Sequence, residues 1–280
     1  MRALPRQSGL ALLSGYTEKD MDLRLQGKRA LVTGGSQGIG EGIARTLASE
    51  GVNLVLTARS QTNLARVKAA IEETSGVTVD ILPLDITVPG ACETLAEQAG
   101  DIDLLVNNAG DIPGGDLFDI DEEKWRAAWE LKVFGYINLC RLIYPRLKAR
   151  GGGVIINIIG NAGEVYDPNY IAGTTGNASL MAFTRALGGN SLADKVRVVA
   201  INPGPVRTER IYTLLKKLAK THYGDESRYT ELEAKYPLGR PAEIAEIADL
   251  AAFLASDRSA YTTGTIFAVD GGIASRRSIV

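Results

Sequence analysis

The chain has 280 residues, 45% of them hydrophobic, and a formal net charge of −2. This length and apolar content suit a single large α/β domain, and the balanced charge argues against nucleic acid as a partner. No apolar run reaches the roughly 18 residues that a membrane span needs. Two cysteines far apart in the sequence, Cys92 and Cys140, indicate reduced thiols and a cytoplasmic location.

Residues 1–25 carry too short an apolar stretch for a signal peptide, and we expect them to be a leader or docking arm. Residues 26–280 then form one domain. Apolar, β-rich runs predict strands, and helix-period stretches lie between them. The expected strands are 29–33, 52–57, 77–83, 103–107, 153–159, 196–202 and 265–269, and the expected helices are 39–50, 63–75, 122–150, 175–193 and 242–255. This alternation predicts a Rossmann-type, doubly wound sheet of seven parallel strands between two helical layers.

One long polar segment, residues 206–237, interrupts this pattern after a strand end, where open parallel sheets bind ligands. We interpret it as a substrate lid, with disorder as the alternative. It holds the only histidine, His222, which is more simply a surface residue than a catalyst. Its apolar and aromatic residues suggest an apolar or aromatic ligand, or packing alone: Ile211, Tyr212, Leu214, Leu215, Tyr223 and Tyr229.

The stretch TGGSQGIG, residues 33–40, lies between the first predicted strand and helix. Glycine allows the backbone to approach a pyrophosphate, and the helix N-terminus supplies N–H donors. Arg59 follows the second strand, where an NAD site usually carries a carboxylate, so it favours NADP(H) over NAD(H). The alternative is that Arg59 is simply a solvated surface residue.

From about Leu25 to Gly272 the chain resembles the short-chain dehydrogenase/reductase family. The resemblance rests on TGGSQGIG, Asp85 in PLDIT, the sequence NNAG at 107–110, NPGPVRT at 202–208 and VDGG at 269–272. It implies that Asp85 binds adenine, that the NNAG residues line the adenosine ribose, and that NPGPVRT meets the nicotinamide end. The expected cofactor-binding residues are Gly34, Ser36, Gln37, Gly38, Ile39, Gly40, Arg59, Asp85, Ile86, Asn107, Ala109, Gly110, Asn177, Pro203, Gly204, Val206 and Thr208.

The family's catalytic tetrad consists of asparagine, serine, tyrosine and lysine, and the lysine lowers the pKa of the tyrosine from about 10. Counted from the PG motif 26 residues downstream, the lysine position is Asn177. Four residues earlier is Gly173 at the tyrosine position, and thirteen earlier again is Gly160 at the serine position. Lys132 aligns with the asparagine. A register that uses Tyr170 as the catalytic tyrosine fits none of these spacings.

Some residues able to transfer protons remain nearby, so we consider a relocated pair in which Tyr166 or Tyr170 is activated by Lys132. The alternative is that Lys132 forms an ordinary ion pair and that the tyrosines pack. Nothing in the chain has the spacing of a zinc site.

Three functions remain open: an NADP(H)-dependent carbonyl or alcohol oxidoreductase with non-standard proton transfer, a non-redox lyase, isomerase or cyclase, and a catalytically silent nucleotide sensor. The resemblance also implies a homodimer or homotetramer that acts on a small molecule, and the lack of a long apolar run argues against a membrane partner.

Overall fold

The computed structural model describes residues 21–276. Within them, a seven-stranded parallel sheet has the order β3-β2-β1-β4-β5-β6-β7. This is the predicted Rossmann-type architecture. The strands are β1 (Arg29–Thr33), β2 (Asn53–Ala58), β3 (Val79–Pro83), β4 (Leu104–Asn107), β5 (Gly153–Ile158), β6 (Val196–Pro203) and β7 (Ile266–Val269). All seven predicted strands are present, and their ends lie within two residues of the expected positions.

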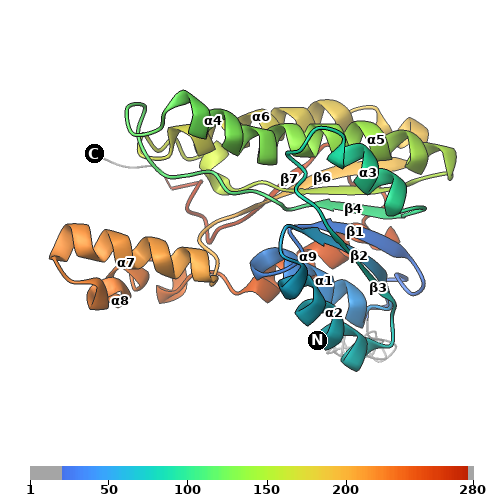
Figure 1. The fold of residues 1–280 in the computed structure, drawn as a ribbon, viewed down its shortest axis with the longest axis horizontal. Helices are drawn as coiled ribbons and strands as arrows, with labels where there is room; N and C mark the ends of the chain where they lie inside the picture. The colour runs from blue at the N-terminus through green and yellow to red at the C-terminus, as the bar shows by residue number, and fades with distance from the viewer. Residues whose placement is uncertain (1–20, 277–280) are drawn as a thin grey trace, which may run out of the picture.

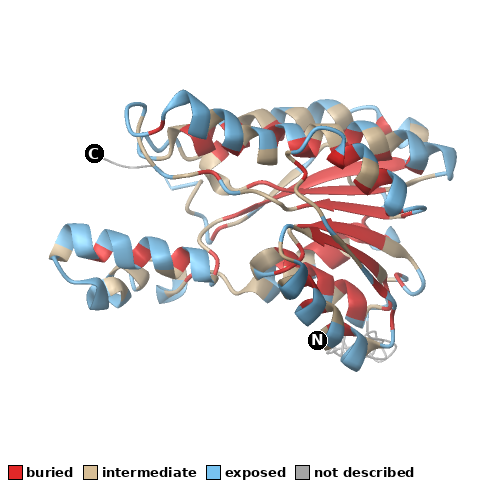
Figure 2. Cartoon of the chain, viewed as in Figure 1, coloured by how far each residue is buried: buried red, intermediate tan, exposed pale blue. Residues whose placement is uncertain are grey.

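Helices cover both faces of the sheet (Figure 1). One face packs against α1 (Gly38–Ser49), α2 (Gln61–Ser75) and α9 (Ile244–Ala255). The other packs against α3 (Ala91–Gln98), α5 (Gly135–Ala149) and α6 (Ile171–Gly188). Side chains on both faces of the sheet are buried, as the red strands of Figure 2 show. This explains why the strands read as continuous apolar runs.

The predicted helix over 122–150 contains an irregularity. It runs as α4 (Glu122–Trp129), a π-helical turn (Glu130–Phe134) and α5. A π-turn widens the helix and changes the direction of the side chains it carries, and such turns often mark functional sites. Lys132 lies at the centre of this one.

Residues 206–239, which we call the projecting segment, leave the body of the molecule after β6 (Figure 1). They form α7 (Glu209–Tyr223) and α8 (Tyr229–Glu233), so this part of the chain is helical rather than irregular. Figure 2 shows that most of its surface is exposed. In α7 only Ile211, Leu215 and Ala219 are buried.

The predicted leader lies outside the described residues except for Met21–Leu25, of which Leu25 is buried in the core. No helix among residues 21–276 is long and apolar enough to cross a membrane. Both cysteines are free and buried, and burial raises the pKa of Cys92 to about 11 and of Cys140 to about 12.

Candidate active site

The glycine turn between β1 and α1 is built for a close backbone approach. Gly34 has a φ of +64°, and a Cβ on it would lie 2.9 Å from the Asn108 amide nitrogen. Asn108 in turn donates from Nδ2 to the carbonyls of Thr33 (3.0 Å) and Gly34 (3.2 Å). The Thr33 hydroxyl accepts from the backbone N–H groups of Asn108 and Ala109. The two predicted nucleotide motifs, TGGSQGIG and NNAG, are therefore bound to one another at the carboxyl ends of β1 and β4.

The NPGPVRT segment, predicted to meet the nicotinamide, also reaches the glycine turn. Thr208 is the N-cap of α7, and its methyl group would lie 3.6 Å from a Cβ on Gly38. Gly204 packs against Asp270 of the VDGG motif, where a Cβ would come within 2.8 Å of the Asp270 Cβ. Motifs from the beginning, middle and end of the chain thus meet around one edge of the sheet.

The expected adenine end carries one carboxylate and two guanidinium groups. Thr87 donates to Asp85 from its hydroxyl (2.7 Å) and its N–H (3.0 Å), and these bonds, with a smaller contribution from Arg59, lower the pKa of Asp85. Arg59 is exposed at the end of β2. Arg66, which the sequence did not single out, donates to the Ser36 carbonyl at 3.1 Å and to Glu41.

Asn107 is turned into the protein. It is fully buried, and its Nδ2 donates to Asn157 Oδ1 at 2.9 Å, which continues to Thr184 through Asn157 Nδ2. Its side chain therefore supports the sheet beneath the site, so a cofactor contact at this position would use the backbone.

Three of the four positions that motif spacing assigned to a catalytic tetrad lie close together: Lys132, Gly160 and Asn177. Gly160 has a φ of +133°, and a Cβ on it would lie 3.1 Å from Asn177 Nδ2. Lys132 donates from Nζ to the carbonyl of Ile159, the residue before Gly160, at 2.5 Å. The ammonium of Lys132 and the carboxamide of Asn177 therefore approach adjacent peptides from two different helices.

Gly173 lies under the ring of Tyr170. A Cβ on Gly173 would overlap Cε1 and Cζ of that ring, so the tyrosine occupies the space that any side chain at 173 would need. Tyr170 is the N-cap of α6, and its backbone forms an isolated bridge with Gly115. The expected start of this helix at 175 was one turn late, because α6 begins at Ile171.

The electrostatic surroundings of these groups differ. Burial, with a smaller contribution from the charge of Arg210, lowers the pKa of Lys132 to about 7. Burial raises the pKa of Tyr170, and Arg210 beside it acts in the opposite direction. Asn177 is 2% exposed, and its Oδ1 has no hydrogen-bond partner among the described residues.

Three other residues complete the comparison with the sequence. Tyr166 is 80% exposed and His222 is exposed on α7, so the structure does not bring either into this cluster. Arg210, which the sequence did not single out, binds residues 110–112, and Gly110 of this loop lies against the Lys132 side chain. Arg210 could have been found from the sequence, because it lies in the first turn of a helix that follows the carboxyl end of a strand.

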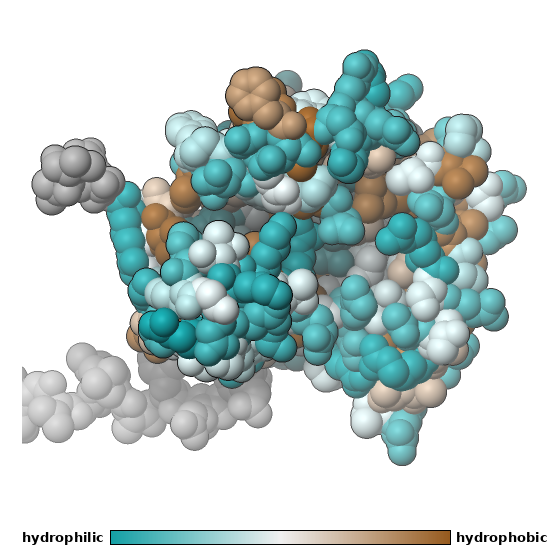
Figure 3. Space-filling model, turned by 60° about the vertical axis from the view of Figure 1, so that its left-hand side comes forward, coloured by the Kyte–Doolittle hydropathy of each residue, from teal (hydrophilic) through white to brown (hydrophobic). Residues whose placement is uncertain are grey.

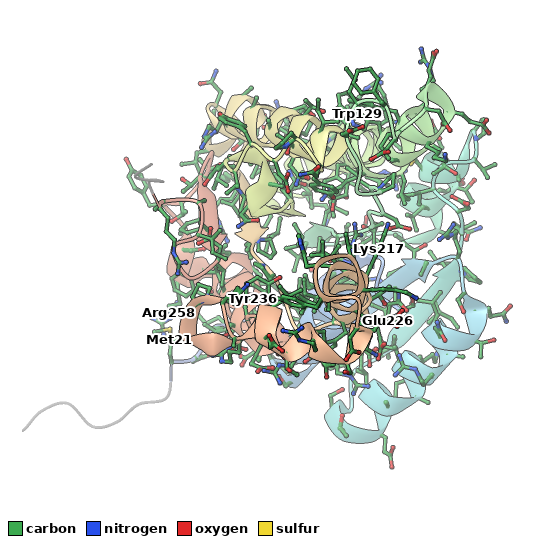
Figure 4. The ribbon with its side chains drawn as sticks, turned by 90° about the vertical axis from the view of Figure 1, so that its left-hand side faces the viewer. Met21, Trp129, Lys217, Glu226, Tyr236 and Arg258 are labelled. Atoms are coloured by element: carbon green, nitrogen blue, oxygen red, sulfur yellow. The ribbon has the colours of Figure 1, made fainter. Side chains whose placement is uncertain are left out.

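The projecting segment stands beside the body of the molecule (Figure 1). Figure 3 shows a mainly hydrophilic surface on this segment and a hollow between it and the body. In Figure 4, Trp129 lies in the helical layer opposite the segment and Lys217 lies on α7. Trp129 fixes the near end of α6 by donating from Nε1 to the Ala172 carbonyl at 3.0 Å.

A second hollow, of about 280 Å³, lies at the opposite edge of the sheet and includes Lys28, Arg150 and Arg197 in its lining. Arg150 pairs with Asp101 and Asp103. Arg197 is buried and donates to the carbonyls of Leu254, Ala255 and Ser256 at the end of α9. These two guanidinium groups are engaged in holding the fold together.

Comparison with known proteins agrees with this geometry. Residues 34–274 match the family described as Enoyl-(Acyl carrier protein) reductase. The chain is 36% identical to the oxidoreductase UcpA of Salmonella typhimurium over 259 residues, which cover 89% of this chain and 95% of that protein. It is 32% identical to the 2-keto-3-deoxy-L-fuconate dehydrogenase of Xanthomonas campestris, with 89% and 81% covered.

Among solved structures, the L-sorbose reductase of Gluconobacter frateurii, complexed with NADPH and L-sorbose, superposes with a TM-score of 0.86. It is 33% identical, and the match covers 92% of this chain and all of that one. The chain therefore belongs to the short-chain dehydrogenase/reductase family and has the NAD(P)-binding scaffold of its oxidoreductases.

Proposed function

We propose that this protein is an NADP(H)-dependent oxidoreductase of a carbonyl or alcohol substrate, in which all four tetrad positions are substituted and Tyr170 transfers the proton. The observation that carries this proposal is the position of the Tyr170 ring over Gly173. The phenol of Tyr170, about one helical turn before Gly173, thus occupies the space that the glycine leaves open. The two residues form one arrangement, since a side chain at 173 would exclude the ring.

The residues of the site fit a dinucleotide. The glycine turn offers the close approach that a pyrophosphate needs, and Asn177 carries a buried acceptor without a partner, suited to a ribose hydroxyl. A bound nicotinamide would supply or accept the hydride, which the protein's own side chains cannot do. During reduction, Tyr170 would donate its proton to the carbonyl oxygen as negative charge develops there, and would recover a proton from solvent.

Lys132 and Asn177 supply the remaining polar groups. In the family, a lysine stands at position 177 and an asparagine at position 132, and this chain has the reverse. The ammonium and the carboxamide are thus both retained, on exchanged helices. Their convergence on Ile159 and Gly160 supports the interpretation that they act together beside the nicotinamide ribose.

Our proposal of NADP(H) rests on the end of β2. Arg59 follows Ala58 directly, with Ser60 next, so no carboxylate stands where one would bind a ribose 2′-hydroxyl. Arg66 adds a second guanidinium near Ser36 of the glycine turn. The structural relative that is complexed with NADPH supports the same choice.

We propose further that residues 206–237 form a lid over a small-molecule substrate and that the protein acts as a homodimer or homotetramer in the cytoplasm. Within the lid, the rings of Tyr212 and Tyr229 pack edge to face at 5.9 Å, and Tyr223 lies against Arg228. Leu214 remains 47% exposed and is the better candidate for contact with an apolar ligand.

Two measurements test the proposal. Calorimetric titration of the purified protein with NADPH and with NADH should give tighter binding of NADPH. A screen of ketoses, keto acids and aromatic ketones, in which turnover is measured by the change in nicotinamide absorbance, should then identify a substrate. Lack of binding of both nucleotides would refute the oxidoreductase, and turnover without an absorbance change would favour a non-redox enzyme.

With a substrate in hand, Tyr170→Phe should reduce kcat by ~10²–10⁴-fold, the usual contribution of a positioned acid. Tyr261→Phe is the matched control, since Tyr261 is 96% exposed, and its kcat should stay at the wild-type value. A large loss in Tyr166→Phe with normal turnover of Tyr170→Phe would assign the proton transfer to the other predicted tyrosine.

A further inference from the structure

Arg210 joins the projecting segment to the predicted cofactor loop. It lies in the first turn of α7, and its guanidinium donates to the Ile112 carbonyl at 2.8 Å, to Asp111 Oδ1 at 3.3 Å and to the Gly110 carbonyl at 3.5 Å. All three acceptors belong to the segment that follows β4. Docking of the first turn of α7 therefore places a permanent positive charge at this loop, because a guanidinium does not lose its proton in proteins.

Tyr170 is bound to the same loop. Its backbone bridges to Gly115, and the neighbouring Asn169 carbonyl accepts from the Gly115 N–H at 2.7 Å. Its ring packs against the apolar cluster that contains Ile112, the residue whose carbonyl accepts from Arg210. The charged groups that act on its phenol are Arg210 and Asp111. Residues 110–115 thus contact both Arg210 and Tyr170.

Lys132 is committed elsewhere. Its Nζ binds the Ile159 carbonyl, and its aliphatic chain passes along Gly110, where a Cβ would lie 2.8 Å from Lys132 Cδ. Arg210 is close enough to disfavour the protonated form of Lys132 as well. The cation that acts on the tyrosine therefore comes from α7 and not from the helix that carries Lys132.

We propose that Arg210 is the positioning residue that stabilises the Tyr170 phenolate, so that proton transfer requires α7 to be docked on the cofactor loop. This inference rests on the proposed function, and it assigns to the lid an electrostatic role in addition to covering the substrate. When α7 moves away, Tyr170 loses the neighbouring positive charge, and its phenolate form becomes less stable. Reaction is then confined to the closed state.

The test reads the tyrosine directly, without substrate. The full chain is produced with 3-fluorotyrosine, whose phenol ionises at lower pH than that of tyrosine, and is titrated by ¹⁹F NMR, with the Tyr170 signal identified by its loss in Tyr170→Phe. In Arg210→Gln we expect the midpoint of Tyr170 to rise by about one pH unit, the lower end of the effect of a neighbouring charge. Arg210→Lys keeps the charge but loses the planar guanidinium, so its Tyr170 midpoint should lie between those of Arg210→Gln and wild type.

Two further variants sharpen the result. Asp111→Asn removes the negative neighbour and should lower the midpoint. Lys217→Gln removes one positive charge from the same helix roughly 10 Å farther along and should leave the midpoint unchanged. An unmoved midpoint in Arg210→Gln, or an equal shift in Lys217→Gln, would overturn the inference. The proposed function is judged separately by turnover of Tyr170→Phe, so the two can fail independently.

Discussion

Replacing Gly173 by alanine is the most direct test of the proposed proton-transfer site. The added methyl group would overlap the ring of Tyr170 at Cε1 and Cζ. Gly173 itself is buried within α6, so its backbone has little room to retreat. The ring should therefore leave its position, because it is attached at the end of the helix and its side chain can rotate.

Both stability and turnover should respond. Forcing a methyl group into a packed site costs about 1–3 kcal/mol. For a domain of this size that corresponds to a fall in Tm of ~2–12 °C. Displacement of the phenol should lower kcat as far as Tyr170→Phe does, by ~10²–10⁴-fold. Differential scanning fluorimetry and the nicotinamide absorbance assay measure the two effects.

The controls separate steric overlap from the general effect of alanine in a helix. Gly189→Ala lies at the end of the same helix, where a Cβ would meet the Arg185 carbonyl at 3.4 Å, an ordinary contact. It should leave Tm and kcat unchanged or raise Tm slightly. In the double variant Gly173→Ala/Tyr170→Ala the two effects on stability should be less than additive, because the overlapping ring is gone. Normal turnover in Gly173→Ala would refute the reasoning.

Four other predictions follow from single contacts. Arg59→Ala should weaken NADPH binding far more than NADH binding in calorimetric titration, and equal losses would reject the 2′-phosphate site. Asn177→Leu should weaken both nucleotides by about 1–3 kcal/mol, as expected for a buried acceptor; unchanged Kd values would remove Asn177 from the site. Arg197→Met should lower the free energy of urea unfolding by about 1–3 kcal/mol, because the carbonyls at the end of α9 lose a buried donor, and a loss below about 0.5 kcal/mol would contradict that role. Burial lowers the pKa of Lys132 to about 7 in the folded state, so between pH 7 and about 10 the unfolded chain binds more protons and wild-type stability should rise with pH relative to Lys132→Met. A difference that does not change over this range in urea unfolding would show that Lys132 is well solvated.

The sheet could be predicted because its signal is local. β1 occupies the expected residues, 29–33, since an apolar run between a lysine and a glycine turn has clear ends. The first helix was likewise marked by the glycine turn. The short helix α3 was not predicted, because eight residues of Ala91–Gln98 give little periodicity.

The site was only partly predictable. Motif spacing singled out Gly160, Gly173 and Asn177, and the structure places Gly160 and Asn177 beside the peptide that Lys132 binds. The early start of α6 was missed because GTTGN has weak helical propensity, and packing of Gly176 against Trp129 compensates for it. The π-turn at Lys132 and the contact of Arg210 with the 110–112 loop depend on tertiary packing. Neither leaves a periodic signal in the sequence.

The two buried cysteines offer a practical route to the motion of α7. Their thiols are held in the protonated, unreactive form at neutral pH, since burial raises the pKa of Cys92 to about 11 and of Cys140 to about 12. The two native cysteines should therefore not react with maleimide dyes while the chain is folded. A single cysteine introduced on the exposed side of α7 would then be labelled alone and would report movement of α7 by fluorescence, with both native cysteines left in place.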